Sequence, residues 1–147
     1  MPMPILAPAA ILVAWSIVML LWAVAVRMPA LKNAKIPKNR TVGGRGSDLD
    51  GILPRETQWK AHNYNHLMEQ PTIFYATAFA LQLLSITDQN TITLAWAYVG
   101  LRVVHSFVQA TVNIILVRFS IFVAASVVLG FLIYRAALGV GLLQFSF

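Results

Sequence analysis

The sequence predicts an all-α fold, an integral membrane bundle of four helices. Of its 147 residues, 59% are hydrophobic and only 11% are charged, and the apolar residues gather in long runs instead of alternating with polar ones. Polar stretches divide these runs into four segments, each long enough to cross a bilayer. A chain of this length fits one compact bundle, so we expect a single transmembrane domain over residues 1–147.

The first predicted helix covers residues 5–26, which are almost purely apolar. About 22 residues at ~1.5 Å each span a hydrocarbon core of ~30 Å. No basic residue precedes the run, and it is longer than the core of a signal peptide, so we expect the helix to be retained. A polar loop over residues 27–56 follows and holds most of the Lys and Arg residues.

The remaining helices are predicted over residues 57–86, 92–116 and 119–143. Between the first two of these, residues 87–91 form a short turn, whose Asp, Asn and Thr residues can cap the helix that follows. Pro71 lies inside the 57–86 segment, where a proline removes a backbone hydrogen bond and usually kinks the helix. We expect this kink either to be a simple packing feature or to free the carbonyl group of Leu67 close to other polar groups.

The positions of Lys and Arg predict the orientation of the chain. The 27–56 loop is crowded with them, the second turn has none, and the third turn holds Arg118. The positive-inside rule therefore predicts that this loop and Arg118 are cytoplasmic and that both termini are periplasmic. Most of the basic residues behind the net charge of +6 lie in this loop, where we expect them to contact anionic lipid head groups. We therefore expect no binding of nucleic acid.

Two stripes of polar residues run along the predicted second and third helices. The first stripe lies within residues 62–71, and its members at spacings of three and four are His62, Asn65 or His66, and Glu69. The second stripe has the same period and consists of Tyr98, Arg102, His105, Gln109 and Asn113. Polar faces avoid lipid, so we expect the two stripes to face each other or a shared cavity.

Glu69 and Arg102 are both predicted to lie near the bilayer midplane. Glu69 is about nine residues, or ~13 Å, from the cytoplasmic entry of its helix, and Arg102 is about ten residues, or ~15 Å, from the opposite side. A lone charge at that depth costs roughly 2.5–3.5 kcal/mol. We therefore predict an ion pair between these two side chains.

The other polar groups offer more hydrogen-bonding capacity than a bundle needs for assembly. They either satisfy one another across helix interfaces or form a cationic pocket, open to the cytoplasm, for an anionic, peptide-like ligand. A metal or haem site at His62 and His66, with His105 nearby, is a further alternative. The chain has no cysteine and no second carboxylate to complete that ligand set, so we expect no metal.

Three features of the sequence together resemble a known family. They are residues 65–75 (Asn-His-Leu-Met-Glu-Gln-Pro-Thr-Ile-Phe-Tyr), residues 101–106 (Leu-Arg-Val-Val-His-Ser), and Arg118 at the start of the fourth helix. The resemblance is to the MAPEG family, membrane proteins of eicosanoid and glutathione metabolism, and in particular to its bacterial branch. It covers nearly the whole chain. It implies a four-helix bundle in a bacterial inner membrane that assembles as a homotrimer, with glutathione as a cosubstrate held between subunits near the cytoplasmic side.

The resemblance also implies roles for individual residues. Glu69 and Arg102 are the implied intramembrane pair, and Arg118 matches the catalytic arginine that favours the thiolate form of glutathione. The implied residues around the ligand are Arg27, Asn65, His66, His105 and Gln109, and we add His62, Glu69 and Arg102 from the polar stripes.

Four positions depart from the pattern of characterised family members. Asparagine is usual where this chain has His66, and tyrosine where it has Gln109. The prostaglandin E-forming members have serine and tyrosine where this chain has Phe119 and Phe122. Several glutathione contacts are therefore replaced, and the mouth of the pocket becomes more apolar.

Two functions from different classes remain open at this point. The first is a glutathione or other thiol transferase or peroxidase that acts on lipophilic electrophiles. The second is a non-catalytic membrane protein, either a lipid-binding module or an accessory subunit of a larger membrane complex, which the apolar Phe119 and Phe122 favour. For both we expect membrane lipids, lipophilic small molecules and further copies of the chain as partners.

Overall fold

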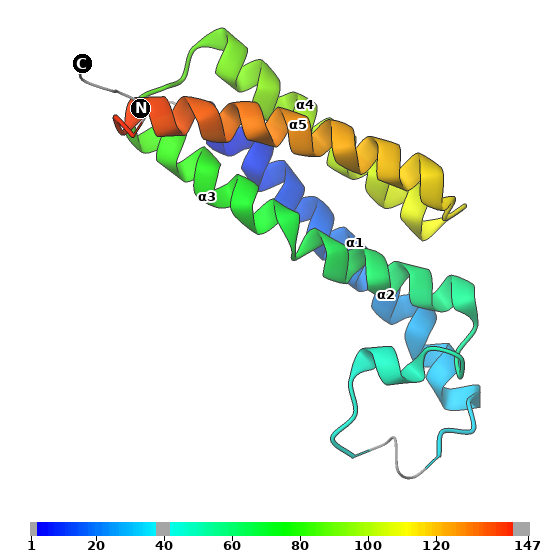
Figure 1. The fold of residues 1–147 in the computed structure, drawn as a ribbon. Coiled ribbons are helices and arrows are strands. Elements are labelled where there is room, and N and C mark those ends of the chain that lie inside the picture. The colour runs from blue at the N-terminus through cyan, green and yellow to red at the C-terminus, as the bar shows by residue number, and fades with distance from the viewer. Residues whose placement is uncertain (1–2, 38–41, 143–147) are drawn as a thin grey trace.

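The computed structural model describes residues 3–37 and 42–142, which form a bundle of helices (Figure 1). In chain order the elements are α1 (Leu6–Asn33), the short 3-10 helix η2 (Gly46–Leu49), α2 (Arg55–Leu67), α3 (Gln70–Leu83), α4 (Gln89–Ala110) and α5 (Ile115–Gly139). Within the described residues there is no strand, only an isolated bridge between Asp50 and Leu53. The predicted all-α fold is confirmed.

Three helices, α1, α4 and α5, are long and apolar enough to cross a membrane. The shorter α2 and α3 follow one another alongside α1 and together take the place of the predicted second helix (Figure 1). Large apolar side chains point outwards from the bundle, among them Leu21 at 63% exposure and Leu116 at 74%. Such a surface suits lipid rather than water. The fold is therefore the predicted four-helix membrane bundle, with its second helix in two pieces.

The second predicted helix is interrupted at Met68 and Glu69 instead of being merely kinked. The Met68 amide donates to the carbonyl oxygen of Asn65 at 2.9 Å, which closes α2 with a tight turn. The next helix, α3, begins at Gln70 and has Pro71 in its first turn, where the missing N–H removes no helical hydrogen bond. The proline thus starts a new helix after a two-residue break.

The first predicted helix is longer in the structure than in the prediction. It continues to Asn33, seven residues past the predicted end at residue 26. The added segment contains one residue each of the good helix formers Arg, Met, Ala, Leu and Lys. It also contains Pro29, which the helix accommodates, and a helix does not have to end where its apolar run ends. Its last turn includes Lys32, which complements the negative end of the helix dipole.

The turn between α4 and α5 comes earlier than predicted. The third helix was predicted to reach residue 116, but α4 ends at Ala110 and α5 already begins at Ile115. Asn113 explains the early end. It has a φ of +52°, a left-handed conformation that asparagine tolerates better than most residues, and its amide donates to the carbonyl oxygen of Val108 at 2.7 Å.

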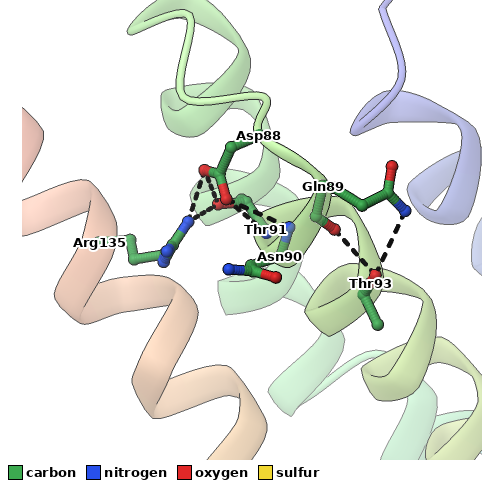
Figure 2. A network of polar contacts seen from close by, with 6 residues as sticks. All are labelled: Asp88, Gln89, Asn90, Thr91, Thr93 and Arg135. Atoms are coloured by element: carbon green, nitrogen blue, oxygen red, sulfur yellow. Dashed lines mark hydrogen bonds and ion pairs between the residues drawn. The ribbon is translucent and has the colours of Figure 1, made fainter.

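The turn over residues 87–91 caps α4 as predicted, and Asp88 is the residue that forms the cap (Figure 2). Its Oδ1 atom accepts from the backbone amides of Asn90 at 3.2 Å and Thr91 at 3.3 Å, and its Oδ2 atom accepts from the Thr91 hydroxyl at 2.7 Å. Arg135 of α5 donates to the same Oδ2 atom at 2.5 Å and also to the Thr91 hydroxyl oxygen. This network ties the start of α4 to the far end of α5.

The apolar core lies between α1, the end of α2, α3, α4 and α5. Phe74 of α3 stacks on Tyr98 of α4 with ring centroids 4.4 Å apart, and both side chains are fully buried. Further members of this core are Leu12, Met19, Leu67, Leu81, Val99, Leu129 and Leu132. Because Tyr98 belongs to the polar stripe of α4, this packing turns that whole stripe towards the inside of the bundle.

Candidate functional site

A pocket of about 170 Å³ lies where the end of α2, the inner face of α4 and the start of α5 meet. Its lining residues are His66, His105, Ile115, Arg118, Phe119 and Phe122. Three of the predicted site residues, His66, His105 and Arg118, are therefore brought together in one place. The two histidines form the inner wall, and α5 supplies the apolar wall and the arginine.

The histidines of the pocket are held in fixed orientations. The rings of His66 and His105 stack with centroids 4.9 Å apart, and Phe122 meets His66 edge-on at 5.6 Å. Arg102 Nη2 lies 3.0 Å from His66 Nδ1. A guanidinium has only donors, so Nδ1 is the acceptor and the proton of a neutral His66 ring is on Nε2. The inner wall of the pocket therefore consists of aromatic rings, and the tautomer of His66 is defined.

Arg102 lies behind the histidines and is fully buried. Its Nη2 atom also donates to the backbone carbonyl oxygen of His66 at 3.0 Å. That carbonyl belongs to the last turn of α2, where helix ends leave acceptors without intrahelical partners. The kink at Pro71 was expected to free the carbonyl group of Leu67. The guanidinium of Arg102 instead binds the carbonyl group of the preceding residue, His66.

The predicted ion pair between Glu69 and Arg102 is absent from the chain. Among the described residues, ion pairs are formed by His62 with Asp50 and by Arg135 with Asp88. The prediction assumed an unbroken helix, but α2 ends at Leu67, so the helical period that aligned Glu69 with His66 is lost. Glu69 is exposed on the outside of the bundle.

Arg118 stands at the mouth of the pocket with spare hydrogen-bonding capacity. Its Nη1 atom donates to the side-chain oxygen of Asn113, while its buried Nε atom has no partner among the described residues. Arg118 lies in the first turns of α5, whose N-cap residue Ile114 supplies no capping side chain. The free backbone amides and the positive end of the helix dipole add to the guanidinium, and together they favour an anion at this point.

Two of the predicted ligand-binding residues, Arg27 and His62, do not line this pocket. Arg27 Nη2 donates to the carbonyl oxygen of Gly46 at 2.5 Å and lines a different cavity of about 490 Å³. His62 Nε2 lies 3.0 Å from Asp50 Oδ1. Within one chain, therefore, Arg27 and His62 serve the loop that precedes α2.

The last two predicted ligand-binding residues also do not line the pocket of about 170 Å³. Asn65 is exposed on the outer face of α2. Gln109 is buried in α4, and its side-chain oxygen has no partner among the described residues.

The positions of the three histidines bear on the alternative of a metal or haem site. Among residues 3–37 and 42–142, no three His, Asp or Glu side chains lie together as a ligand set. His62 binds Asp50, whereas His66 binds Arg102 and stacks on His105. The two rings of the i, i+4 pair thus have separate sets of partners.

Sequence reasoning missed a polar cluster between α1, α2 and α4. Ser106 Oγ accepts from Trp15 Nε1 at 3.0 Å and from Asn63 Nδ2 at 2.6 Å, and Ser106 and Asn63 are both fully buried. Both residues lie at helical spacings from members of the stripes, since Ser106 is four residues after Arg102 and Asn63 is three before His66. A single hydroxyl in an apolar helix gives too weak a pattern to predict which residues it joins.

Comparison with known proteins decides the family of this chain. The model of the MAPEG family matches residues 5–138, a segment that begins just before α1 and ends in the last turn of α5. The chain belongs to the MAPEG family. The resemblance expected from residues 65–75, residues 101–106 and Arg118 is therefore confirmed. Comparisons with curated proteins and with solved structures gave no significant match.

Membership of the MAPEG family explains the main features of the architecture. It is a membrane family, in agreement with the three apolar helices that can span a bilayer. The matched segment includes every residue that lines the pocket at the start of α5. The pocket therefore belongs to the part of this MAPEG chain that it has in common with its family.

Proposed function

We propose that this MAPEG protein binds glutathione, or another low-molecular-weight thiol, as a cosubstrate in the pocket beside Arg118 and transfers it to lipophilic electrophiles. The observation that carries the proposal is the arginine itself. It is held by the neutral Asn113, and its buried Nε donor has no partner in the part of the chain that the structure describes. An anionic ligand supplies the negative counter-charge that the neutral Asn113 does not provide.

The chemistry follows from the charge of Arg118. A guanidinium close to a thiol favours the thiolate, which is the nucleophilic form. The thiol proton passes to water, the thiolate sulfur forms a bond to an electrophilic carbon, and the electron pair of the leaving group or of the attacked double bond moves away from that carbon. In this reaction Arg118 stabilises negative charge and does not itself transfer a proton.

The outer wall of the pocket suits a lipophilic second substrate. Phe119 is 61% exposed and Ile115 is 74% exposed, and both lie on the side of α5 that continues into the apolar outer surface. A substrate dissolved in the bilayer reaches such a wall without crossing water. The position of Phe119 and Phe122, where prostaglandin E-forming members have polar groups, favours apolar electrophiles.

We further propose that the protein acts as a homotrimer in a bacterial inner membrane, with the 27–56 loop cytoplasmic and both termini periplasmic. Support comes from Glu69, an exposed carboxylate on a surface that otherwise suits lipid. It also comes from Arg102, whose buried Nε and Nη1 atoms have no partner within residues 3–37 and 42–142. A neighbouring subunit that covers the break between α2 and α3 removes the carboxylate from lipid. Glu69→Gln is then expected to weaken trimers, measured by native mass spectrometry in mild detergent.

A second candidate function is lipid binding without catalysis, as a module of its own or as an accessory subunit. The same exposed Phe119 favours it, because an apolar rim also fits an acyl chain. A stable partner that co-purifies in mild detergent, together with an absence of thiol binding, would support this alternative.

Calorimetric titration of glutathione into detergent-purified protein tests the leading proposal. We expect saturable binding to the wild type, weakened about tenfold or more in Arg118→Ala because a charged hydrogen-bond donor is removed. Arg135→Ala is the matched control, since it removes an arginine of the same helix at the opposite end. No binding to the wild type, or equal binding to Arg118→Ala, would contradict the proposal.

A further inference from the structure

A second pocket, of about 370 Å³, lies between the loop after η2 and the first turns of α2. The polar residues that line it are Asp50, Arg55, Gln58, His62 and Asn113. It is separate from the pocket of about 170 Å³, although Asn113 lines this one and its side chain binds Arg118 of the other. The proposed thiol chemistry makes no use of it.

Gln58 is the informative residue of this second pocket. Only 3% of it is exposed, and its Nε2 atom donates to Asp50 Oδ1 at 2.6 Å. The carboxylate fixes the orientation of the amide, because a flipped amide would place two acceptors against each other. The Oε1 atom is left buried with no partner in the described part of the chain. A buried acceptor without a donor costs about 1–3 kcal/mol, so a ligand that donates here is favoured.

The charge of the pocket specifies which kind of donor fits. Asp50 Oδ1 already accepts from Gln58 Nε2 and lies 3.0 Å from His62 Nε2, so the carboxylate stands fixed at the pocket wall. A carboxylate next to an unpaired amide oxygen favours a cationic donor over a neutral one. A primary ammonium group has three N–H donors and fits both oxygens.

The rim of the pocket carries the opposite charge. Arg55, at the start of α2, lines the pocket and is exposed. A guanidinium at this position pairs with a phosphate or carboxylate. The lining thus offers acceptors inside and a cationic donor outside, which is the pattern that a small zwitterion needs.

We propose that this pocket binds a primary ammonium group that is joined through a few atoms to a phosphate or carboxylate. The ammonium donates to Gln58 Oε1 and faces Asp50, and the anionic end faces Arg55. Two sources carry this chemistry, the phosphoethanolamine head group of a lipid and a free amino acid or peptide. The site does not depend on the thiol function, because the two pockets have no lining residue in common. They are connected by the hydrogen bond from Arg118 to Asn113.

Calorimetry with glycerophosphoethanolamine and glycerophosphocholine tests this proposal on the detergent-purified protein. The second probe differs by three methyl groups that remove every N–H donor. We expect saturable binding of the ethanolamine probe and binding at least about tenfold weaker for the choline probe, the factor that corresponds to one lost hydrogen bond to a charged group. Equal affinity for the two probes would overturn the proposal.

Two variants and a control separate binding from folding. Gln58→Met removes the acceptor at nearly constant length, and Asp50→Asn removes the charge but keeps an oxygen for Gln58 and His62. Both are expected to weaken ethanolamine binding about tenfold. Glu56→Gln removes an exposed carboxylate from the same turn of α2 and is expected to bind as the wild type does. If Asp50→Asn folds with an unchanged melting temperature and binds the probe as tightly as the wild type, the proposal is wrong.

A further pair of measurements distinguishes the two sources. Nanodiscs with phosphatidylethanolamine are expected to leave this lipid bound after detergent extraction, to a smaller extent in Gln58→Met, if the lipid is the source. Titration with glutamate is expected to give the binding isotherm instead if a free amino acid is the source. Glutathione titration of Gln58→Met reports separately on the thiol site, so failure of the ammonium site and failure of the proposed function give different results.

Discussion

The two ends of α5 each carry an arginine, and the two side chains have opposite surroundings. Arg135 donates to the Asp88 carboxylate and to the Thr91 hydroxyl, so its charge is compensated by a charge of opposite sign (Figure 2). Arg118 donates to the neutral side chain of Asn113, and its buried Nε atom has no partner in the described ranges 3–37 and 42–142. Among the residues that the structure describes, Arg135 has an anionic partner and Arg118 has none.

This difference indicates which arginine has a structural role and which one binds a ligand. A guanidinium that already pairs with a carboxylate gains little from a second anion, and at Arg135 the pair joins the cap of α4 to α5. The pocket that Arg118 lines also contains His66 and His105, whose rings stack on each other. An anion that enters this pocket finds an uncompensated positive charge.

Replacing each arginine by alanine is the strongest test of the different roles of Arg118 and Arg135. Arg118→Ala is expected to lower thiol conjugation on the order of 10²-fold, the usual effect of losing one group that stabilises developing negative charge. Its melting temperature is expected to stay close to that of the wild type. Arg135→Ala is expected to do the reverse, with a lower melting temperature and unchanged conjugation. The measurements are conjugation rates and thermal unfolding in the same detergent, and equal loss of activity in both variants would contradict the assignment.

Acidification is expected to weaken the structural end of α5. The Thr91 hydroxyl lowers the pKa of Asp88, and the Thr91 amide and Arg135 act in the same direction. Because the folded pKa is below the unfolded one, the stability from this carboxylate is present above the ordinary aspartate pKa of about 3.9 and is lost as the pH falls through the lower folded value.

Thermal unfolding over an acidic pH series measures this effect. Asp88→Asn is expected to melt below the wild type at neutral pH and to approach it at the acidic end, since the protonated aspartate is neutral as well. A difference between the two proteins that stays constant over the whole series would show that the charge of Asp88 is unimportant.

The smallest expected effect concerns the orientation of Arg118. Asn113 adopts a left-handed conformation that glycine adopts at no steric cost, so Asn113→Gly should preserve the turn between α4 and α5. It removes the oxygen that holds the Arg118 guanidinium. We expect conjugation to fall by a few fold with an unchanged melting temperature, and an unchanged rate would mean that Arg118 needs no positioning by Asn113.

The apolar segments and the cap at Asp88 could be predicted from the sequence because both follow from local rules. A run of apolar residues sets the place of a helix, and Asp88 in a polar turn finds amide donors two and three residues on. The inner face of α4 could be predicted for the same reason, since Arg102 and His105 repeat with the helical period.

The partners of the polar residues could not be predicted, because they depend on the break at Met68 and Glu69. Pro71 predicts a disturbance of the helix but not whether the helix is kinked or broken. That difference decides whether Glu69 lies on the same helical face as His66. With a full break, Arg102 binds the His66 carbonyl, and Glu69 points outwards. Contacts between segments far apart in the chain, such as Gln58 with Asp50, leave no periodic signal either.

The most direct test of the central assignment is the ultraviolet difference spectrum of glutathione bound to the protein at neutral pH, where thiolate and thiol absorb differently. We predict a thiolate band with the wild type and with Arg135→Ala, and its loss with Arg118→Ala at saturating glutathione. A thiolate band of equal size in Arg118→Ala would contradict the assignment of the uncompensated arginine as the group that holds the anion.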